Sequence, residues 1–484
     1  MVSSRHEPTR GDGPIRMSLP TGEERSPHPV LSCPALFDRK DLPWVASAVL
    51  MAIGLRILWI AYVNVDPNDG RFTDSVFFHN TAYLLASGHG YIEPYGRELT
   101  AQWPPGYPAT LALVYKLFGW HLILAKVLNI CFAAVTVVLT YLAGRRIFGQ
   151  PVAYGGAIVL GLFPGQIFFS ALVFRETMFA MVFMLVLLMT LVWSRGHTGA
   201  RWWQLLLIGA LIGVAGMVRA EGVLLAFVLV AFWALTVRPW RRVARYGAVM
   251  ALGATLALTP WTVRNAVQLQ EFTPLSSNPT GVITRSLTPD RGARAPRFGE
   301  LVEATLKETV NYQLTHPWEV PELVGRKIAK LYQNDSAGIN LVQPGGVWFV
   351  ERVPDDDSGS FHLVLHRRIE YGAPPPVRAL SEQEASRWRW LADRYFFSMG
   401  AAALAGAVIG LRSRNRASLL LIVTALGWTL LFGFIPPSPR FHFALGPVIS
   451  ILAAASLVYA WTGARTVLDR WFFGQVDGSL SGGC

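Results

Sequence analysis

The feature that most constrains this chain is the recurrence of apolar runs along almost its whole length. Each run covers about 16 to 24 residues, close to the ~20 that a helix needs to cross a bilayer. Only 15% of the 484 residues are charged, whereas a soluble domain is nearer to a quarter charged. The sequence therefore predicts an all-α, polytopic membrane protein. About ten transmembrane helices are predicted, at residues 44–63, 121–144, 152–170, 176–194, 203–219, 221–236, 246–263, 390–411, 417–435 and 441–461.

The arginines give these runs a sidedness. They gather in short loops at residues 145–146, 195–201, 238–245 and 412–416. Such loops are typical of the cytoplasmic side of an inner membrane. Because topology explains the net charge of +12, no nucleic-acid partner is expected. We predict a multi-pass protein of the cell membrane, with a disordered cytoplasmic tail at 1–43 and a second cytoplasmic tail at 462–484.

Counting the crossings places a first loop outside the membrane, at residues 64–120. Residue 64 is then external and residue 145 is cytoplasmic, so one crossing lies between them, and the run at 121–144 fits it best. Residues 104–119 must therefore stay on the outer side. They are short and amphipathic and begin with PPGYP, which predicts a helix lying in the membrane interface.

A polar insertion at residues 264–389 separates the N-terminal membrane module, 44–263, from the C-terminal transmembrane helices, 390–461. The same counting makes this insertion external. Apolar residues recur at helical spacing within 300–334, so amphipathic helices are predicted there.

Ionisable residues mark the external ends of the predicted helices. They are Asp74 in the first loop, Arg175 with Glu176, Arg219 with Glu221, Arg264, and Arg440 with His442. Charges at a membrane boundary are costly to bury, so a function is the default expectation for them. A carboxylate can deprotonate an acceptor hydroxyl, and arginines can bind a phosphate leaving group. Carboxylates and arginines on one face therefore suit group transfer from a phosphate-linked donor.

Several of these residues also have a structural explanation. Asp74 could be a helix N-cap, Glu176 could favour a helix dipole, and Arg440 could anchor lipid headgroups. His79 and His89 lie near Asp74 in the sequence, but their spacing is not diagnostic of a metal site. The sequence thus leaves open whether a divalent metal ion is bound, and it indicates no other cofactor.

The order of short motifs resembles that of GT-C class membrane glycosyltransferases of family 39, which include protein O-mannosyltransferases and the lipid A aminoarabinose transferase. The matching pieces extend over nearly the whole chain. They are Asp74 with AYLLASGHGY, PPGYPATLALVYKLFG, YLAGRRIFG, LFPGQIFFSALVFRE, GMVRAEG, TPWTVRN, THPWEV and PRFHFALGP.

The resemblance implies a GT-C fold with interfacial helices in the first external loop and catalysis in the module at 44–263. Asp74 matches the first-loop acid expected to act as base, and Glu176 matches the second external acid. The residues expected near the donor phosphate are Arg264, Arg440, Arg175 and Arg219, and those expected on the acceptor side or in the loop are His79, Tyr107 and His442. One departure is that Ser75 follows Asp74 where protein O-mannosyltransferases carry an Asp-Glu pair, which makes protein mannosylation a weaker expectation.

The expected reaction is inverting transfer of a sugar from a polyprenyl-phosphate donor to a hydroxyl of a glycan, lipid or protein, on the external face. Membrane lipids are the other expected partners. No cytoplasmic loop is long enough for a nucleotide-binding domain, which favours a lipid donor. The alternative is a lipid or sugar transporter or flippase, although such proteins usually show internal repeats and mid-membrane charges. A non-catalytic scaffold is a third alternative.

Overall fold

The computed structural model describes ten stretches of the chain, which exclude most of the predicted N-terminal tail, the last part of the C-terminal one and parts of the segments predicted to be external. The stretches are residues 37–63, 73–193, 200–277, 311, 314–342, 348–354, 361–367, 380–413, 415–435 and 438–473. Of the tail predicted to be disordered at 1–43, residues 1–36 lie outside them, whereas residues 39–43 form a 3-10 helix and the start of the first long helix. Residues 64–72 of the first loop and most of the predicted amphipathic region before residue 314 also lie outside the described stretches.

The described chain is nearly all helical. Its first half contains α1 (Leu42–Val63), α2 (Thr73–Ala86), α3 (Gly106–Phe118), α4 (Leu122–Phe148), α5 (Gln150–Leu162), α6 (Pro164–Phe168), α7 (Glu176–Trp193), α8 (Trp202–Val218), α9 (Leu225–Thr236) and α10 (Trp240–Gln268). Its second half contains α13 (Val320–Leu331), α14 (Ala337–Val342), β1 (Trp348–Pro354), β2 (Phe361–Arg367), α16 (Glu382–Arg412), α17 (Arg416–Phe432), the 3-10 helix η5 (Pro439–Leu445) and α18 (Gly446–Phe473).

Each of the ten predicted runs coincides with an apolar helix or a helix pair. In the described residues, six helical segments are long and apolar enough to cross a membrane, and α5 with α6 forms a seventh span if the bent pair is counted as one. Three shorter apolar helices occupy the remaining runs, at Trp202–Val218, Ala220–Thr236 and Arg416–Phe432. The structure therefore supports a multi-pass membrane fold, while length and composition alone do not establish ten crossings.

A proline explains the break between α5 and α6. Phe163 adopts an extended backbone (φ −66°, ψ 110°) and Pro164 begins α6. A residue before proline is driven out of the helical region by the proline ring, so α5 ends there, and the two helices meet at 56°. The following residues form a short non-spanning segment that leads to Arg175 and the start of α7.

Glycines allow close packing of two helices, α8 and α10. A Cβ atom on Gly209 would collide with the backbone of Met250, and one on Gly253 would collide with the backbone of Leu206. Small residues that let backbones approach are the usual basis of helix association in membranes. The contact fixes α8, whose C-terminal end carries Arg219.

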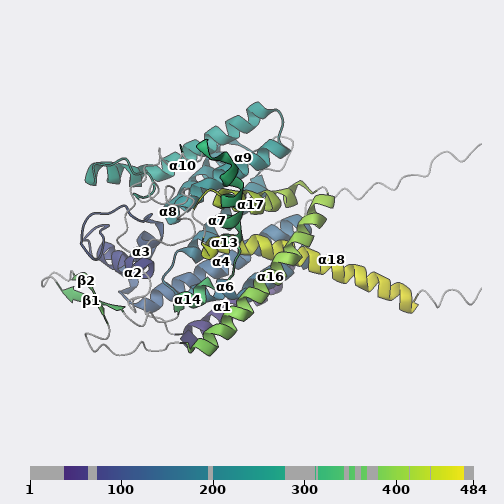
Figure 1. Ribbon diagram of the computed structural model, residues 1–484. Helices are drawn as coiled ribbons and strands as arrows, with labels where there is room; N and C mark the ends of the chain where they lie inside the picture. The colour runs from purple at the N-terminus through teal and green to yellow at the C-terminus, as the bar shows by residue number, and fades with distance from the viewer. Residues whose placement is uncertain are drawn as a thin grey trace, which may run out of the picture.

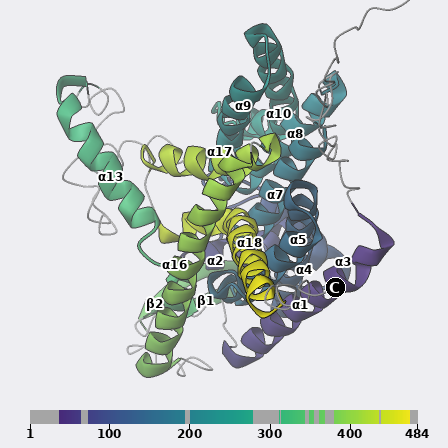
Figure 2. The same cartoon turned by 90° about the vertical axis from the view of Figure 1, so that its right-hand side faces the viewer.

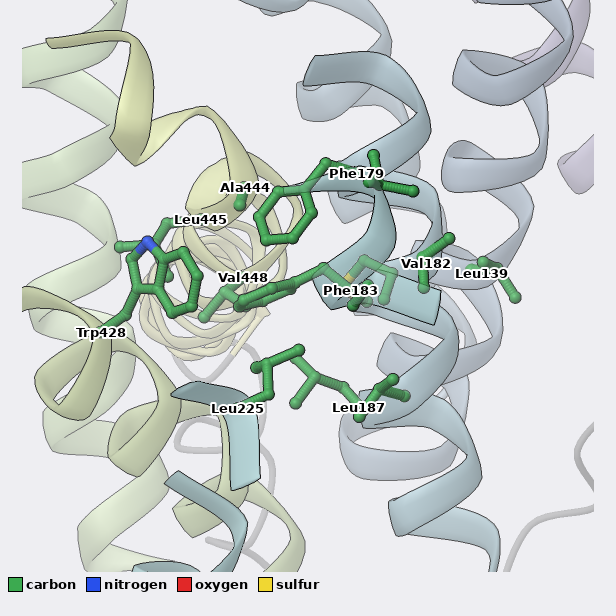
Figure 3. Packing of buried hydrophobic residues seen from close by; sticks show 14 of the residues in the cluster. Leu139, Phe179, Val182, Phe183, Leu187, Leu225, Trp428, Ala444, Leu445 and Val448 are labelled. Atoms are coloured by element: carbon green, nitrogen blue, oxygen red, sulfur yellow. The ribbon is translucent and has the colours of Figure 1, made fainter. Parts of the chain in front are cut away.

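The core beneath the ionisable residues joins α7, α17 and α18. Phe179 and Phe183 of α7 contact Trp428 of α17, with ring centroids 5.9 and 5.2 Å apart, and Val448 of α18 packs beside them (Figure 3). This aromatic packing holds together helices that are far apart in the sequence.

Several of the segments predicted to be external lie at one end of the molecule. Figure 1 shows α2, α3 and the β1–β2 hairpin at one end and the C-terminal part of α18 at the other, and the view in Figure 2 shows α13 at the periphery of the helices. The helix predicted at 104–119 is present as α3, and α13 lies within the region predicted to be amphipathic. The sequence missed the hairpin, in which Trp348 pairs with Arg367 and Pro354 with Phe361 in antiparallel register.

Candidate functional site

Four helix ends bring together the acids and arginines predicted from the sequence. Arg440 Nη1 donates a 2.9 Å hydrogen bond to Asp74 Oδ2, and Arg440 Nε lies 4.0 Å from Glu176 Oε1. On the other side of Glu176, Arg219 Nη1 donates a 2.9 Å hydrogen bond to Oε1. Arg219 Nη2 then lies 3.5 Å from Glu221 Oε1. We call this chain of contacts the charged cluster; it comprises Asp74, Arg440, Glu176, Arg219 and Glu221.

The helices explain why these charges lie at their ends. Asp74 lies in the first turn of α2 and Glu176 in the first turn of α7, where a carboxylate meets the positive end of the helix dipole. Arg219 caps the C-terminus of α8, where a cation is favoured for the opposite reason. Because α2 begins at Thr73, Asp74 lies inside the helix rather than at its N-cap, and its carboxylate contacts Arg440.

Glu176 and Arg219 are the most deeply buried members of the cluster, with side chains 2% and 3% exposed. Asp74 and Arg440 are 14% and 22% exposed. The cluster thus contains a buried ion pair, Glu176–Arg219, and a partly solvent-accessible one, Asp74–Arg440. A buried ion pair is costly to desolvate and is weak evidence of stabilisation by itself, so its burial at a helix junction points to a role beyond stability.

Aromatic rings enclose the arginines. The Arg219 guanidinium lies 4.5 Å from the ring centroid of Phe441, and Arg440 lies 5.7 Å from that of Phe174. Arg175, which precedes α7, lies 4.9 Å from the Trp103 ring. Cations are attracted to ring faces, and more strongly where water is excluded. These rings hold the guanidiniums in place while leaving hydrogen-bond donors for other partners.

Three buried polar atoms in and beside the cluster make no hydrogen bond with the described residues. They are Arg175 Nη1, Glu176 Oε2 and Arg219 Nη2. Buried polar groups without partners are rare and costly, so each requires an explanation. Arg219 Nη2 still has its 3.5 Å ion-pair contact with Glu221 Oε1, so Arg175 is the arginine of this group without a charged partner among the described residues.

A small pocket opens onto the cluster. Its lining consists of Glu176, Arg219, Arg440, Phe179, Trp428, Phe432, Phe441, Phe443 and Ala444. Charged groups occupy one part of the wall and aromatic or apolar groups the rest. A headgroup that joins an anion to an apolar chain suits such a lining.

Arg175 lies close to the cluster without an ion pair to any residue that the structure describes. Burial and the neighbouring Arg219 lower the pKa of Arg175 to about 10. The guanidinium therefore stays protonated at neutral pH, and its positive charge is available to an incoming anion.

Arg264, predicted to bind the donor phosphate, lies outside the charged cluster. Its Nη1 donates to the Thr100 carbonyl at 2.8 Å and its Nη2 to the Tyr91 carbonyl at 2.9 Å, and its guanidinium stacks over Trp261. The structure thus gives Arg264 partners in the backbone of the first loop. The same loop is tied by Ser277, whose N–H donates to the Ala101 carbonyl.

The three residues predicted on the acceptor side or in the loop are buried and have partners inside the fold. His79 Nδ1 lies 2.7 Å from the Tyr115 hydroxyl, and the Tyr107 hydroxyl donates to Asn129 Oδ1 at 3.3 Å. His442 contacts Asp335. None of the three lines the pocket at the cluster, because each ring packs between helices instead.

Two carboxylates were not assigned a role from the sequence. Glu221 follows Arg219 at the end of a predicted helix, so its place in the cluster could have been inferred from that position. Asp335 lies in a polar QNDS segment, and nothing in its sequence context predicts that it is buried. Among the described residues, no group of three or more His, Cys, Asp or Glu is arranged to hold a metal ion, and the divalent metal stays an open expectation.

Comparisons with known sequences cover part of the chain. A family model described as dolichyl-phosphate-mannose-protein mannosyltransferase matches residues 102–263. The chain is 28% identical over 224 residues to the undecaprenyl phosphate-alpha-4-amino-4-deoxy-L-arabinose arabinosyl transferase of Pseudomonas aeruginosa strain UCBPP-PA14. That match covers 45% of this chain and 40% of the relative, so the chain matches less than half the length of this curated relative.

Comparisons with solved structures cover most of the chain. ArnT from Cupriavidus metallidurans, bound to undecaprenyl phosphate, matches with a TM-score of 0.53 and 16% identity, over 88% of this chain and 63% of that one. The oligosaccharyltransferase AglB from Archaeoglobus fulgidus, in complex with an inhibitory peptide and a dolichol-phosphate, matches with a TM-score of 0.52 and 16% identity, over 90% and 52%. At 16% sequence identity, these matches show similarity of the fold alone. The predicted GT-C fold and the predicted resemblance to GT-C class membrane glycosyltransferases are confirmed.

Proposed function

We propose that this protein transfers a sugar from a polyprenyl-phosphate donor to an acceptor hydroxyl, on the external face of the cell membrane. The observation that carries the proposal is the charged cluster, in which acids and arginines from four helix ends meet beside a partly aromatic pocket. The structural relatives supply independent support, since one is bound to undecaprenyl phosphate and another to a dolichol-phosphate.

The open donors suggest where the phosphate of the donor binds. Arg175 Nη1 lacks a hydrogen-bond partner among the described residues, Arg219 Nη2 makes a 3.5 Å contact with Glu221 Oε1, and Arg440 is partly exposed beside them. Arginine hydrogen bonds to phosphate are strong because they are charge-assisted. With the phosphate held there, the lipid chain would extend along the apolar wall towards the bilayer.

Asp74 is the proposed base. The acceptor oxygen attacks the anomeric carbon as the bond from that carbon to the phosphate oxygen breaks. The hydroxyl proton passes to Asp74, and the bonding electron pair leaves with the polyprenyl phosphate. Attack opposite the leaving group inverts the anomeric centre, through a transition state with oxocarbenium character. The arginines stabilise the negative charge that develops on the phosphate.

Because Asp74 and Arg440 form an ion pair, the donor phosphate must bind before Asp74 can act as base. A phosphate that binds Arg440 competes with Asp74 for the same guanidinium. Donor binding would thereby free the carboxylate to accept the hydroxyl proton. Glu176, whose Oε2 is open, is placed to orient the acceptor by accepting a hydrogen bond from it.

The proposal is tested by incubating the purified protein in nanodiscs with undecaprenyl-phosphate-linked sugars and a panel of glycan, lipid and peptide acceptors. Transfer requires that undecaprenyl phosphate is released in proportion to glycosylated product. Movement of intact donor between leaflets of proteoliposomes, without release of undecaprenyl phosphate, would instead identify a flippase and reject the proposal.

A further inference from the structure

His442 is buried in a polar junction two residues after Arg440, on the same 3-10 helix η5. Its ring is nearly inaccessible to solvent. Nδ1 lies 2.8 Å from the carbonyl oxygen of Leu331, at the end of α13, and Nε2 lies 3.0 Å from Asp335 Oδ1. A carbonyl only accepts hydrogen bonds, so Nδ1 carries a proton. Nε2 then either donates to an ionised Asp335 or accepts from a protonated one, and the contact is made in both cases.

Asp335 connects this histidine to two further segments. Its Oδ2 accepts a 3.0 Å hydrogen bond from the N–H of Gly165 in α6, and its own N–H donates to Asp393 Oδ1 of α16 at 2.9 Å. The approach to α6 is so close that a Cβ atom on Gly165 would collide with the carboxylate. One buried residue thus connects η5 and α6 through its side chain and α16 through its backbone N–H.

Aromatic stacking fixes the plane of the histidine ring. The Phe396 ring of α16 lies 4.4 Å from it at an interplanar angle of 22°, and Tyr332 stacks at 6.1 Å and 17°. The Tyr332 hydroxyl contacts Thr429 of α17, at 2.5 Å. Rotation of His442 would break two hydrogen bonds and both stacks, so the ring has one favoured orientation.

We propose that the His442–Asp335 pair is a positioning device that fixes Arg440 and couples it to the external helix α13; this inference rests on the function proposed above. Arg440 reaches the charged cluster from η5, and among the described residues its own ion pairs are to Asp74 and Glu176. The backbone that carries it is held by His442. Because Leu331 ends α13, a shift of that helix is transmitted through His442 to Arg440.

The coupling has a use in sugar transfer. The polar 264–389 insertion, in which α13 lies, is predicted to be external, and we expect it to shape the acceptor site. If an acceptor displaces or orders α13, the movement reaches the arginine that competes with the donor phosphate for Asp74. His442 and Asp335 do not touch the reacting atoms in this scheme, and they act through the placement of Arg440.

The test compares His442→Phe, which keeps a stacked ring and removes both hydrogen bonds, with His442→Gln, which retains an amide able to reach Asp335. Arg440→Gln reports on the cluster itself, and His121→Phe is the matched control, since His121 is exposed. Three quantities are measured in nanodiscs: hydrogen exchange of peptides covering 439–445 and 331–336, affinity for undecaprenyl phosphate, and kcat with donor KM.

We expect His442→Phe to speed exchange in both peptides, to weaken undecaprenyl phosphate binding roughly 10-fold, as for a typical coupling between sites, and to lower kcat by up to ~100-fold through misplacement of a reacting group. His442→Gln should recover part of each loss. Arg440→Gln should lose binding and transfer without faster exchange in 331–336. The His121→Phe variant should behave as the wild type does.

Unchanged exchange in His442→Phe would overturn the inference, and so would faster exchange with wild-type affinity and kcat. The exchange measurement reports on η5 whether or not the chain transfers a sugar. An inactive wild-type protein, or an Arg440→Gln variant with full transfer, would instead count against the proposed function, so the two failures are distinguishable.

Discussion

Arg440 donates a 2.9 Å hydrogen bond to Asp74 across 366 positions of the sequence. The contact joins the last apolar segment of the chain to the first loop, which is predicted to be external. It is partly exposed, whereas the neighbouring pair of Glu176 and Arg219 is buried. We therefore expect a ligand to reach the first pair and to replace one partner of that ion pair. The second pair stays buried.

Replacement of Arg440 by lysine should impair use of the donor while leaving the fold intact. Lysine keeps the charge but cannot direct separate N–H groups at Asp74 and at a phosphate. We expect donor KM to rise and kcat/KM to fall by about 10- to 100-fold, in line with loss of a charge-assisted contact. Arg326→Lys is the control, because that arginine is 69% exposed and pairs with Glu322. Equal kinetics for the two variants would remove Arg440 from the site.

Replacement of Glu176 by glutamine should lower both stability and transfer. The change leaves the Arg219 guanidinium buried without its carboxylate partner, and breaking a buried ion pair costs about 3–5 kcal/mol. A double variant, with Arg219→Gln as well, should regain part of the melting temperature, because the buried Arg219 charge is gone, although Glu221 then loses its 3.5 Å contact with Arg219. Activity should stay low in the double variant, since the site has lost its anion-binding donor. Recovery of activity together with stability would show that the pair is structural only.

Arg264 provides a contrast with Arg440. Its hydrogen bonds go to backbone carbonyls of the first loop, and each bond to a charged group is worth about 1.5–3 kcal/mol. We expect Arg264→Gln to lower the melting temperature and to leave donor KM near the wild-type value among the molecules that remain folded. A large rise in KM at normal melting temperature would instead support the phosphate-binding role predicted from the sequence.

The predicted sidedness can be tested by labelling single cysteines in a background without native ones. Lys116 of α3 and Arg241 of α10 are both exposed in the structure, so a maleimide can reach a cysteine at either position. A membrane-impermeant reagent applied to intact cells should label Lys116→Cys and should label Arg241→Cys only after the membrane is opened. Labelling of residue 241 in intact cells would reverse the topology and move the proposed site to the cytoplasmic face.

Sequence reasoning reached those parts of the site that follow from the ends of apolar runs. Asp74, Glu176 and Arg219 each lie where a predicted helix begins or ends on the external side, and the structure brings them together. His442 and Asp335 could not be paired in this way, because they are 107 positions apart and Asp335 lies outside every predicted apolar run. Their partnership depends on the packing of η5 against α6 and α16, which no local signal encodes.

Contacts between distant segments also explain why the sequence did not predict the partners of Arg264 or the β1–β2 hairpin. The position of Arg264 at the end of a span suggested a ligand role, but the first loop folds back so that its carbonyls reach the guanidinium. The strands β1 and β2 lie in the polar insertion, beyond the 300–334 region in which helices were predicted and where no element was expected. Strand pairing there depends on contacts between segments rather than on hydrophobic periodicity along each one.

The most direct test of the account is Asp74→Asn, measured as initial rate of sugar transfer at matched protein levels in nanodiscs. Asparagine has nearly the size of aspartate but cannot accept the hydroxyl proton, so activity should fall at least ~100-fold, the usual scale of general-base catalysis. Binding of undecaprenyl phosphate should be retained, because Arg440 loses a competitor rather than a partner. Asp69→Asn should transfer normally, because the DPNDG sequence around Asp69 is typical of a solvated turn; this residue lies outside those that the structure describes. An Asp74→Asn protein with near-normal transfer would contradict the central claim.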